Sequence, residues 1–170
     1  MYEIAKKLVQ LASKKNKTIG SCESLTAGLF TSTIASVSGA SAVLKGGLVT
    51  YFSEMKVKLA HVDKEIVDKY GVISKECAEQ MAVRTRNQMN VDYCVSFTGN
   101  AGPSSIEEKP AGRVYCCIAT RYKTYDYEFQ IDNKSRNEVR SIVVETMMEE
   151  IIYLLEKEQS WQKKKIKINY

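Results

Sequence analysis

The stretch SKECAEQMAVRTRNQMNVDYCVSF, residues 74–97, decides the fold class because it joins an amphipathic helix directly to a buried strand. Ser74 is a favourable helix N-cap. The apolar positions that follow share one helical face: Cys77, Ala78, Met81, Ala82 and Met89. Residues 92–97 form a continuous apolar run, which is typical of a strand buried on both faces. This stretch therefore predicts an α/β protein.

Further elements are predicted on both sides of this unit. Towards the N-terminus the pattern predicts a helix at 2–15, a strand at 18–22, a buried helix at 25–37, a strand at 45–51 and one or two short helices in 53–70. Towards the C-terminus it predicts a loop at 98–112, strands at 113–120 and 124–131, and a final helix from about Ser135. This order predicts a three-layer α/β/α sandwich around a mixed sheet that is parallel in its first part.

The composition is that of one globular domain. The 170 residues are 44% hydrophobic and 26% charged, and no apolar run approaches the ~20 residues that span a bilayer. The N-terminus lacks the layout of a signal peptide, so we expect a soluble cytoplasmic protein without a membrane partner. The lysines after Glu158 supply four of the five net positive charges: Lys163, Lys164, Lys165 and Lys167. We expect residues 1–158 to form the domain and 159–170 a basic, solvated tail, which makes a nucleic-acid partner unexpected.

The cysteines and the single histidine exclude two common kinds of site. The five cysteines show no CxxC spacing and lie in apolar stretches, which indicates buried thiols in a reducing compartment. His61 alone cannot supply a zinc site, and the presence of only one histidine in the sequence disfavours a Ser-His-Asp triad. Hydrolytic chemistry would need another base.

Polar residues gather in four segments, 21–28, 50–56, 96–103 and 133–140. Three of the four directly follow a predicted strand, and the ligand crevice of an open α/β sheet lies beyond the carboxyl ends of its strands. We therefore expect the four segments to meet in one cleft.

The first two segments offer a nucleophile and two bases. Ser24 is expected at the start of a helix, where unpaired N–H groups can stabilise an oxyanion or a phosphate, although a plain N-cap serine is the structural alternative. The candidate bases are Lys56 and Tyr51, which can both point back over a strand end. The lysine would need desolvation to lower its pKa well below ~10.4. Each base also has a structural alternative, as a surface lysine and an interfacial tyrosine.

The other two segments offer donors for an anion. The loop Thr98-Gly99-Asn100-Ala101-Gly102 presents main-chain N–H groups, but it matches neither the dinucleotide fingerprint nor the P-loop, and a simple turn is the alternative. Arg136 and Arg140 lie one turn apart at the start of the last helix, where the helix dipole disfavours cations. They are explained either by an anion that binds there or by solvation of both side chains.

Taken together, the four segments resemble the C-terminal domain family of the competence/damage-inducible protein CinA, from about Ile4 to Leu155. The family carries an E-S-C-T-G-G-like turn, a T-Y-S-N-E-A-K-like segment, a T-G-I-A-G-P loop leading to K-P-x-G, and a G-D-R-x-x-V-R-like helix start. The sequence departs from this pattern at several positions: Leu25, Ala27, Asn100, Ser104-Ser105-Ile106 and Lys134-Ser135. The side chains of the candidate site are retained.

The resemblance implies the function of a nicotinamide-nucleotide amidase. By this resemblance Ser24 takes the place of the nucleophile, Tyr51 and Lys56 those of the activating residues, and Thr98 that of a residue in the substrate pocket. Arg136 and Arg140 match the arginines of the last motif. The implied reaction converts nicotinamide mononucleotide to nicotinic acid mononucleotide and ammonia, with no metal or organic cofactor. The alternative is a non-catalytic nucleotide-binding or protein-interaction domain that keeps the pocket.

Two further expectations concern the oxyanion and the assembly. For an amidase that uses Ser24, the N–H groups near Leu25 and Thr26 are expected to hold the oxyanion, with Gly99 also lining the substrate site. The last helix stays apolar through Ile151, Ile152, Leu154 and Leu155, and Tyr153 and Trp161 add large apolar side chains. A surface of that kind indicates a partner site, so we expect a homo-oligomer.

Overall fold

The structure is a computed structural model that describes residues 1–164 of the chain. The helices of this range are α1 (Tyr2–Lys14), α2 (Leu29–Ala35), the 3₁₀ helix η1 (Ala40–Ala42), α3 (Ser53–Lys58), α4 (Lys64–Tyr70), α5 (Lys75–Met89) and α6 (Arg136–Lys164). The strands are β1 (Ile19–Glu23), β2 (Leu44–Val49), β3 (Tyr93–Gly99), β4 (Arg113–Ala119) and β5 (Thr124–Gln130).

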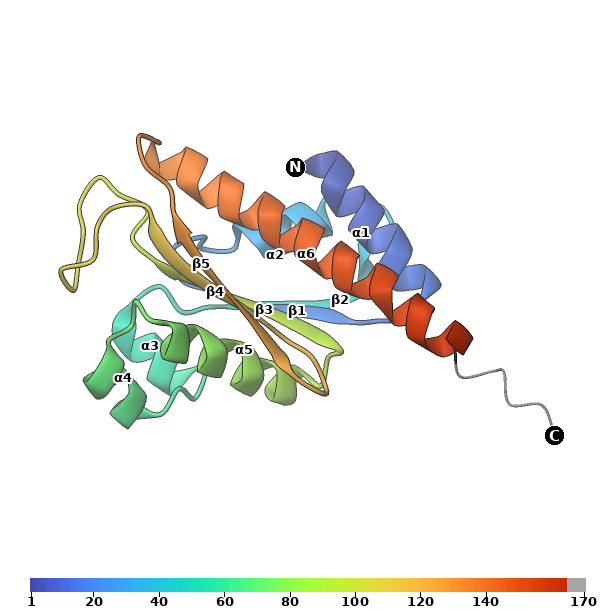
Figure 1. Cartoon of the computed structure of the whole chain (residues 1–170), viewed down its shortest axis with the longest axis horizontal. Coiled ribbons are helices and arrows are strands. Elements are labelled where there is room, and N and C mark those ends of the chain that lie inside the picture. Colours follow the sequence, from blue (N-terminus) through green and yellow to red (C-terminus); the bar gives the residue numbers. More distant parts are fainter. Residues whose placement is uncertain (165–170) are drawn as a thin grey trace.

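The strands form one mixed sheet in the order β2-β1-β3-β4-β5. β1 pairs in parallel with both β2 and β3, while β3, β4 and β5 pair in antiparallel fashion. Helices α1, α2 and α6 cover one face of the sheet, and α3, α4 and α5 cover the other (Figure 1). The predicted three-layer α/β/α sandwich around a partly parallel sheet is confirmed.

The strand order places a crevice at one end of β1. The chain leaves β1 through α2 to reach β2, and it then returns through α3, α4 and α5 to reach β3 on the other side of β1. These two crossovers lie on opposite faces of the sheet (Figure 1), as right-handed connections in opposite directions require. The carboxyl ends of β1 and β3 therefore flank the switch point, where α/β sheets bind ligands.

The two faces of the central strands pack against different helices. On one face Phe30 of α2 lies against Phe97 of β3, with ring centroids 5.6 Å apart, in the larger hydrophobic cluster. On the other face Cys22 of β1 packs with Cys77 and Met81 of α5. Every residue of β1 is buried, as are the first six of β3. The prediction of a strand buried on both faces at 92–97 is thus confirmed.

The helix predicted at 25–37 is shorter than expected. α2 begins only at Leu29, and a turn occupies residues 24–28. Ala27 and Gly28 adopt left-handed φ values of 48° and 92°, so the helix cannot extend back through them. The prediction that Ser24 sits at the start of a helix is therefore wrong. In the stretch 53–70 the structure has two short helices, α3 and α4.

The C-terminal part of the chain concerns the expected basic tail and the expected contribution of Trp161. α6 runs to Lys164, so the first residues of the expected tail, 159–164, continue that helix. The remaining residues, 165–170, and the side chain of Trp161 lie outside the described residues. Within residues 1–164, no helix combines the length and the apolar character that crossing a membrane requires.

Candidate active site

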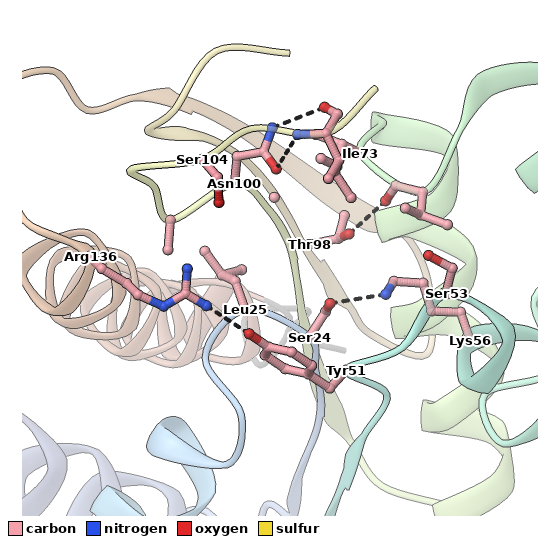
Figure 2. A pocket seen from close by; sticks show the side chains of 14 residues that line it. Ser24, Leu25, Tyr51, Ser53, Lys56, Ile73, Thr98, Asn100, Ser104 and Arg136 are labelled. Atoms are coloured by element: carbon pink, nitrogen blue, oxygen red, sulfur yellow. Dashed lines mark hydrogen bonds between the residues drawn. The ribbon is translucent and has the colours of Figure 1, made fainter. Parts of the chain in front are cut away.

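A cavity of about 230 Å³ lies beyond the carboxyl ends of β1 and β3. All four polar segments contribute to its wall, so the expectation that they meet in one cleft is confirmed. The segment after β1 supplies Ser24 and Leu25, and the segment after β2 supplies Tyr51, Ser53 and Lys56. The rest of the wall consists of Val72, Ile73, Thr98, Gly99, Asn100, Ala101, Ser104, Ile106 and Arg136 (Figure 2).

Ser24 and Lys56 are in direct contact at the floor of this cavity. Lys56 Nζ donates a hydrogen bond to Ser24 Oγ at 2.9 Å and a second to the carbonyl oxygen of Thr50 at 3.0 Å (Figure 2). Ser24 directly follows β1, and Lys56 lies on α3, the first helix after β2. The parallel pairing of β1 with β2 therefore brings together two residues that are 32 positions apart in sequence.

Lys56 is an unusual lysine because only 1% of it is exposed. Among residues 1–164, no carboxylate lies within ion-pair distance of its amine. Burial lowers the pKa of Lys56 from its ordinary value, while the neighbouring Cys77, Cys22 and Glu107 act in the opposite direction. A buried ammonium without a counter-ion is costly, so the environment favours the neutral amine.

Tyr51 is oriented towards Arg136 rather than towards the serine and the lysine. Arg136 Nη2 donates to the Tyr51 hydroxyl at 2.7 Å, and Nη1 donates to the carbonyl oxygen of Gly102 at 2.8 Å. Tyr51 is 55% exposed and stands beside the cavity mouth (Figure 2). The structure thus brings Lys56 to Ser24 and brings Tyr51 to the arginine of α6.

Arg140 and Thr26 do not line the cavity. Arg140 Nη2 donates to the carbonyl oxygen of Thr26 at 2.9 Å, which ties the turn after β1 to α6. Within the described part of the chain, Arg140 Nε and the buried Thr26 hydroxyl have no hydrogen-bond partner. The N–H groups of Leu25 and Thr26 likewise have no acceptor among residues 1–164.

The loop after β3 forms the upper wall of the cavity. Thr98 Oγ1 donates to the carbonyl oxygen of Val72 at 2.6 Å, which joins β3 to the segment before α5. A side chain at Gly99 would come within 2.5 Å of the carbonyl oxygen of Arg113, so this close approach of β3 and β4 requires glycine. Asn100 holds the loop together, because its amide nitrogen donates to the carbonyl oxygens of Ile106 and Lys109.

Sequence reasoning missed two carboxylates that shape the site. Glu107 accepts hydrogen bonds from the N–H groups of Val72 at 2.8 Å and Ile73 at 2.9 Å, and so fastens the loop to the opposite wall. Glu23 is fully buried, and its carboxylate accepts N–H groups at the start of α2. Glu23 directly follows the strand predicted at 18–22 and lies in the first polar segment, so its position was visible in the sequence, but its burial and its partners were not.

The N-terminus of α2 is therefore not available to an anionic ligand. The N–H groups at the start of α2 are taken: those of Gly28, Phe30 and Thr31 donate to Glu23, and that of Leu29 donates to the carbonyl oxygen of Thr26. The N–H groups of Leu25 and Thr26 belong to the turn before this helix. No group of three or more His, Cys, Asp or Glu side chains in the described part of the chain is placed to hold a metal ion. All five cysteines are free and buried, as predicted.

Comparison with protein families identifies the domain. The family model of the CinA C-terminal domain matches residues 1–155. The chain belongs to this family. Two curated relatives, from Streptococcus agalactiae (strain A909) and Streptococcus pyogenes serotype M1, carry names that describe competence-damage inducible proteins and are 43% and 45% identical over 139 residues. Each match covers 82% of this chain and 33% of the relative, so this CinA C-terminal domain spans about a third of their length.

Solved structures support the same fold. The competence/damage inducible protein CihA from Agrobacterium tumefaciens is 29% identical, with a TM-score of 0.86 over 90% of this chain and 94% of that one. A CinA superfamily protein from Klebsiella pneumoniae 700603 is 20% identical, with a TM-score of 0.88 over 92% of this chain and 98% of that one. At 20% identity, the second likeness shows the fold alone.

Proposed function

We propose that this CinA C-terminal domain is an amidase that hydrolyses nicotinamide mononucleotide to nicotinic acid mononucleotide and ammonia. The observation that carries the proposal is the contact of 2.9 Å between the buried amine of Lys56 and the hydroxyl of Ser24 in a cavity. A serine and a desolvated lysine at this distance are the two parts of a hydrolase that works without histidine.

In the acylation step the neutral amine of Lys56 takes the hydroxyl proton as Ser24 Oγ attacks the carboxamide carbon. The oxyanion that forms is assigned to the N–H groups of Leu25 and Thr26, which have no acceptor among residues 1–164. The protonated Lys56 then returns its proton to the amide nitrogen. The C–N bond breaks, ammonia leaves, and an acyl ester on Ser24 remains.

Deacylation uses the same two side chains. Once ammonia has left, a water molecule can occupy its position near Lys56 Nζ. The amine takes a proton from this water as its oxygen attacks the ester carbon, and it then donates the proton to Ser24 Oγ as the ester bond breaks. The carboxylic acid product leaves, and the neutral lysine and the free serine are restored.

The charges of the wall suit an anionic substrate. The residues that line the cavity include the guanidinium of Arg136 and no Asp or Glu, and Lys56 acts as a neutral amine. Arg136 stands exposed at the mouth without a carboxylate partner among the described residues. A volume of about 230 Å³ is below the roughly 300–1,000 Å³ of sites that enclose drug-sized ligands. We therefore assign the nicotinamide ring to the cavity and the 5′-phosphate to Arg136 at its mouth.

The proposal is tested by measuring ammonia release from nicotinamide mononucleotide beside a binding titration with the same ligand. We expect turnover by the wild-type chain and none by Ser24→Ala. Ser36→Ala, which removes an exposed serine hydroxyl at the end of α2, is the control and should retain full activity. Turnover by Ser24→Ala would refute the assignment of the nucleophile. Binding without turnover by the wild type would instead identify a non-catalytic nucleotide-binding domain.

We further propose that the domain forms a homo-oligomer in the cytoplasm. The apolar side chains of α6 that the sequence suggested as a partner surface, Ile151, Ile152, Leu154 and Leu155, are buried in the core of their own domain. The proposal is supported instead by Tyr2 and Tyr153, which are each about half exposed, and by a groove beside Tyr153 between α1 and α6. Free buried thiols fit a reducing compartment. Light scattering at micromolar concentration should give a multiple of the 19.2 kDa chain mass, and a value near 19.2 kDa would refute the assembly.

A further inference from the structure

Glu23 directly precedes the candidate nucleophile Ser24, and its carboxylate accepts several hydrogen bonds. Glu23 is fully buried, and its carboxylate accepts the N–H groups of Gly28 at 2.9 Å, Phe30 at 3.1 Å and Thr31 at 2.9 Å. It also accepts the hydroxyl of Thr31 at 2.6 Å and that of Ser21 at 3.2 Å. These donors satisfy a charge that would otherwise be very costly to bury.

These contacts close the turn that carries Ser24. The backbone of Glu23 belongs to β1, where the turn begins, and its side chain holds the start of α2, where the turn ends. The N–H of Ser24 donates to the carbonyl oxygen of Phe97 at 2.9 Å, which fixes the first residue of the turn against β3. A single side chain thus sets the distance between the two ends of residues 24–28.

The main chain of Glu23 also reaches the lysine. The carbonyl oxygen of Glu23 accepts the N–H of Thr50 at 2.8 Å, and the carbonyl oxygen of Thr50 accepts Lys56 Nζ at 3.0 Å. Both members of the Ser24–Lys56 pair are therefore connected to Glu23. Ser24 is the next residue in the chain, and Lys56 is linked to Glu23 through the main chain of Thr50.

The carboxylate cannot easily be replaced by a neutral group. α2 has only seven residues, and a helix of that length has little stability of its own. A glutamine at position 23 would keep one acceptor oxygen but would turn its NH₂ group towards donors of the α2 turn. Two N–H groups would then face each other in a buried site, so the start of α2 and the turn before it would have to move.

We propose that Glu23 is a positioning residue that holds Ser24 Oγ at hydrogen-bond distance from Lys56 Nζ by clamping the start of α2. This inference rests on the proposed function, in which those two atoms carry out the chemistry. Glu23 does not line the cavity, so its effect must pass through the turn and fall on the rate of the chemical step rather than on substrate affinity.

A matched control separates positioning from a general loss of stability. Asp92 is also a carboxylate that accepts main-chain and hydroxyl hydrogen bonds, from the N–H of Thr18 at 2.8 Å and from its Oγ1 at 2.9 Å. These contacts lie at the opposite end of β1 and β3, away from the cavity. Asp92→Asn should therefore lower the melting temperature without changing kcat.

The experiment compares Glu23→Gln, Thr31→Val and Asp92→Asn with the wild type. We expect Glu23→Gln to lower kcat for nicotinamide mononucleotide by about 10- to 100-fold with KM nearly unchanged, as misplacement of reacting groups does. Thr31→Val removes one donor to Glu23 at nearly constant volume and should give a smaller loss of the same kind. It also tests the proposal if Glu23→Gln fails to fold.

A second measurement keeps this inference separate from the choice of substrate. A fluorophosphonate reagent forms an ester with an activated serine as fluoride leaves, and mass spectrometry gives the rate of labelling at Ser24. We expect the labelling rate to fall in parallel with kcat in Glu23→Gln and Thr31→Val, and to stay at the wild-type level in Asp92→Asn. If the wild type labels but does not deamidate the mononucleotide, the proposed function fails, and the labelling rates alone decide the role of Glu23. Wild-type labelling by both Glu23→Gln and Thr31→Val, or an equal loss in Asp92→Asn, would overturn the inference.

Discussion

The guanidinium of Arg136 donates a hydrogen bond of 2.7 Å to the hydroxyl of Tyr51. This contact joins the start of α6 to the segment after β2 across the mouth of the cavity (Figure 2). It gives the tyrosine a partner on the side of the expected phosphate, whereas the other candidate base, Lys56, donates a hydrogen bond to Ser24. The structure therefore distinguishes the two candidate bases: Lys56 lies against Ser24, and Tyr51 lies against Arg136.

Lys56 should matter much more than Tyr51 for the rate. Lys56→Met removes the only base in contact with Ser24 among the described residues and should lower kcat at least ~10²-fold, as loss of a general base does. Tyr51→Phe keeps the ring and removes the acceptor of Arg136, so it should mainly raise KM. Steady-state kinetics on both variants checks this. Equal losses of kcat in the two variants would point to a coupled pair instead.

The buried lysine should also make stability depend on pH. Because the pKa of Lys56 is lowered in the folded state, the unfolded chain binds more protons between that lowered value and ~10.4. The free energy of unfolding of the wild type should therefore rise with pH across this window relative to that of Lys56→Met. Denaturant titrations at several pH values measure the difference. Lys58→Met, which removes an exposed lysine from the same helix, is the control variant.

Arg136 and Arg140 should differ in their effects on substrates. Arg136 lies at the cavity mouth, so Arg136→Ala should raise KM for nicotinamide mononucleotide and change KM much less for the phosphate-free riboside. Arg140 holds the carbonyl oxygen of Thr26, so Arg140→Ala should lower activity on both substrates to a similar degree. Kinetics on the two substrates tests both statements, and a selective effect of Arg140→Ala on the mononucleotide would contradict the second.

Replacement of Ala27 by glycine should stabilise the protein. Ala27 has a φ of 48°, which costs a residue with a Cβ roughly 1–2 kcal/mol, whereas glycine adopts it freely. The larger entropy of glycine in the unfolded chain offsets part of this gain, so we expect about 0.5–1 kcal/mol in the free energy of unfolding. Ala27 is exposed, so little packing is lost. A lower melting temperature for Ala27→Gly than for wild type would show that the turn is not strained.

The loop over the cavity should loosen when Glu107 loses its charge. Glu107→Gln weakens the two hydrogen bonds to the N–H groups of Val72 and Ile73, so hydrogen exchange at these amides should accelerate and KM should rise. The neighbouring Glu108→Gln is the control, because Glu108 has a similar φ and no hydrogen-bond partner among residues 1–164. Unchanged exchange at Val72 and Ile73 in Glu107→Gln would show that the loop is held by other contacts.

Much of the site could be predicted from the sequence because its parts follow the elements that carry them. Apolar periodicity indicated the helix at 74–90 and the strand after it, and polar residues at strand ends marked Ser24, Lys56 and Thr98. The residue at which the helix after β1 begins could not be predicted in this way. The run from Leu25 to Val37 is apolar and small enough for a helix throughout, yet the chain becomes helical only where Glu23 accepts the N–H groups of Phe30 and Thr31.

The sequence by itself determined the α/β class and the three layers, since these depend on local periodicity and on the order of elements along the chain. The choice of Ser24 as candidate nucleophile came from the resemblance of its segment to the family pattern. Only the tertiary structure decided which base reaches Ser24, that Arg140 holds a carbonyl oxygen outside the cavity, and that Glu23 and Glu107 shape the wall. The physical reason is that hydrogen bonds extend about 3 Å between residues that strand pairing brings together from distant positions. Periodicity along the chain indicates on which face of a helix or strand a residue lies, but it does not indicate the residue with which its side chain forms a hydrogen bond.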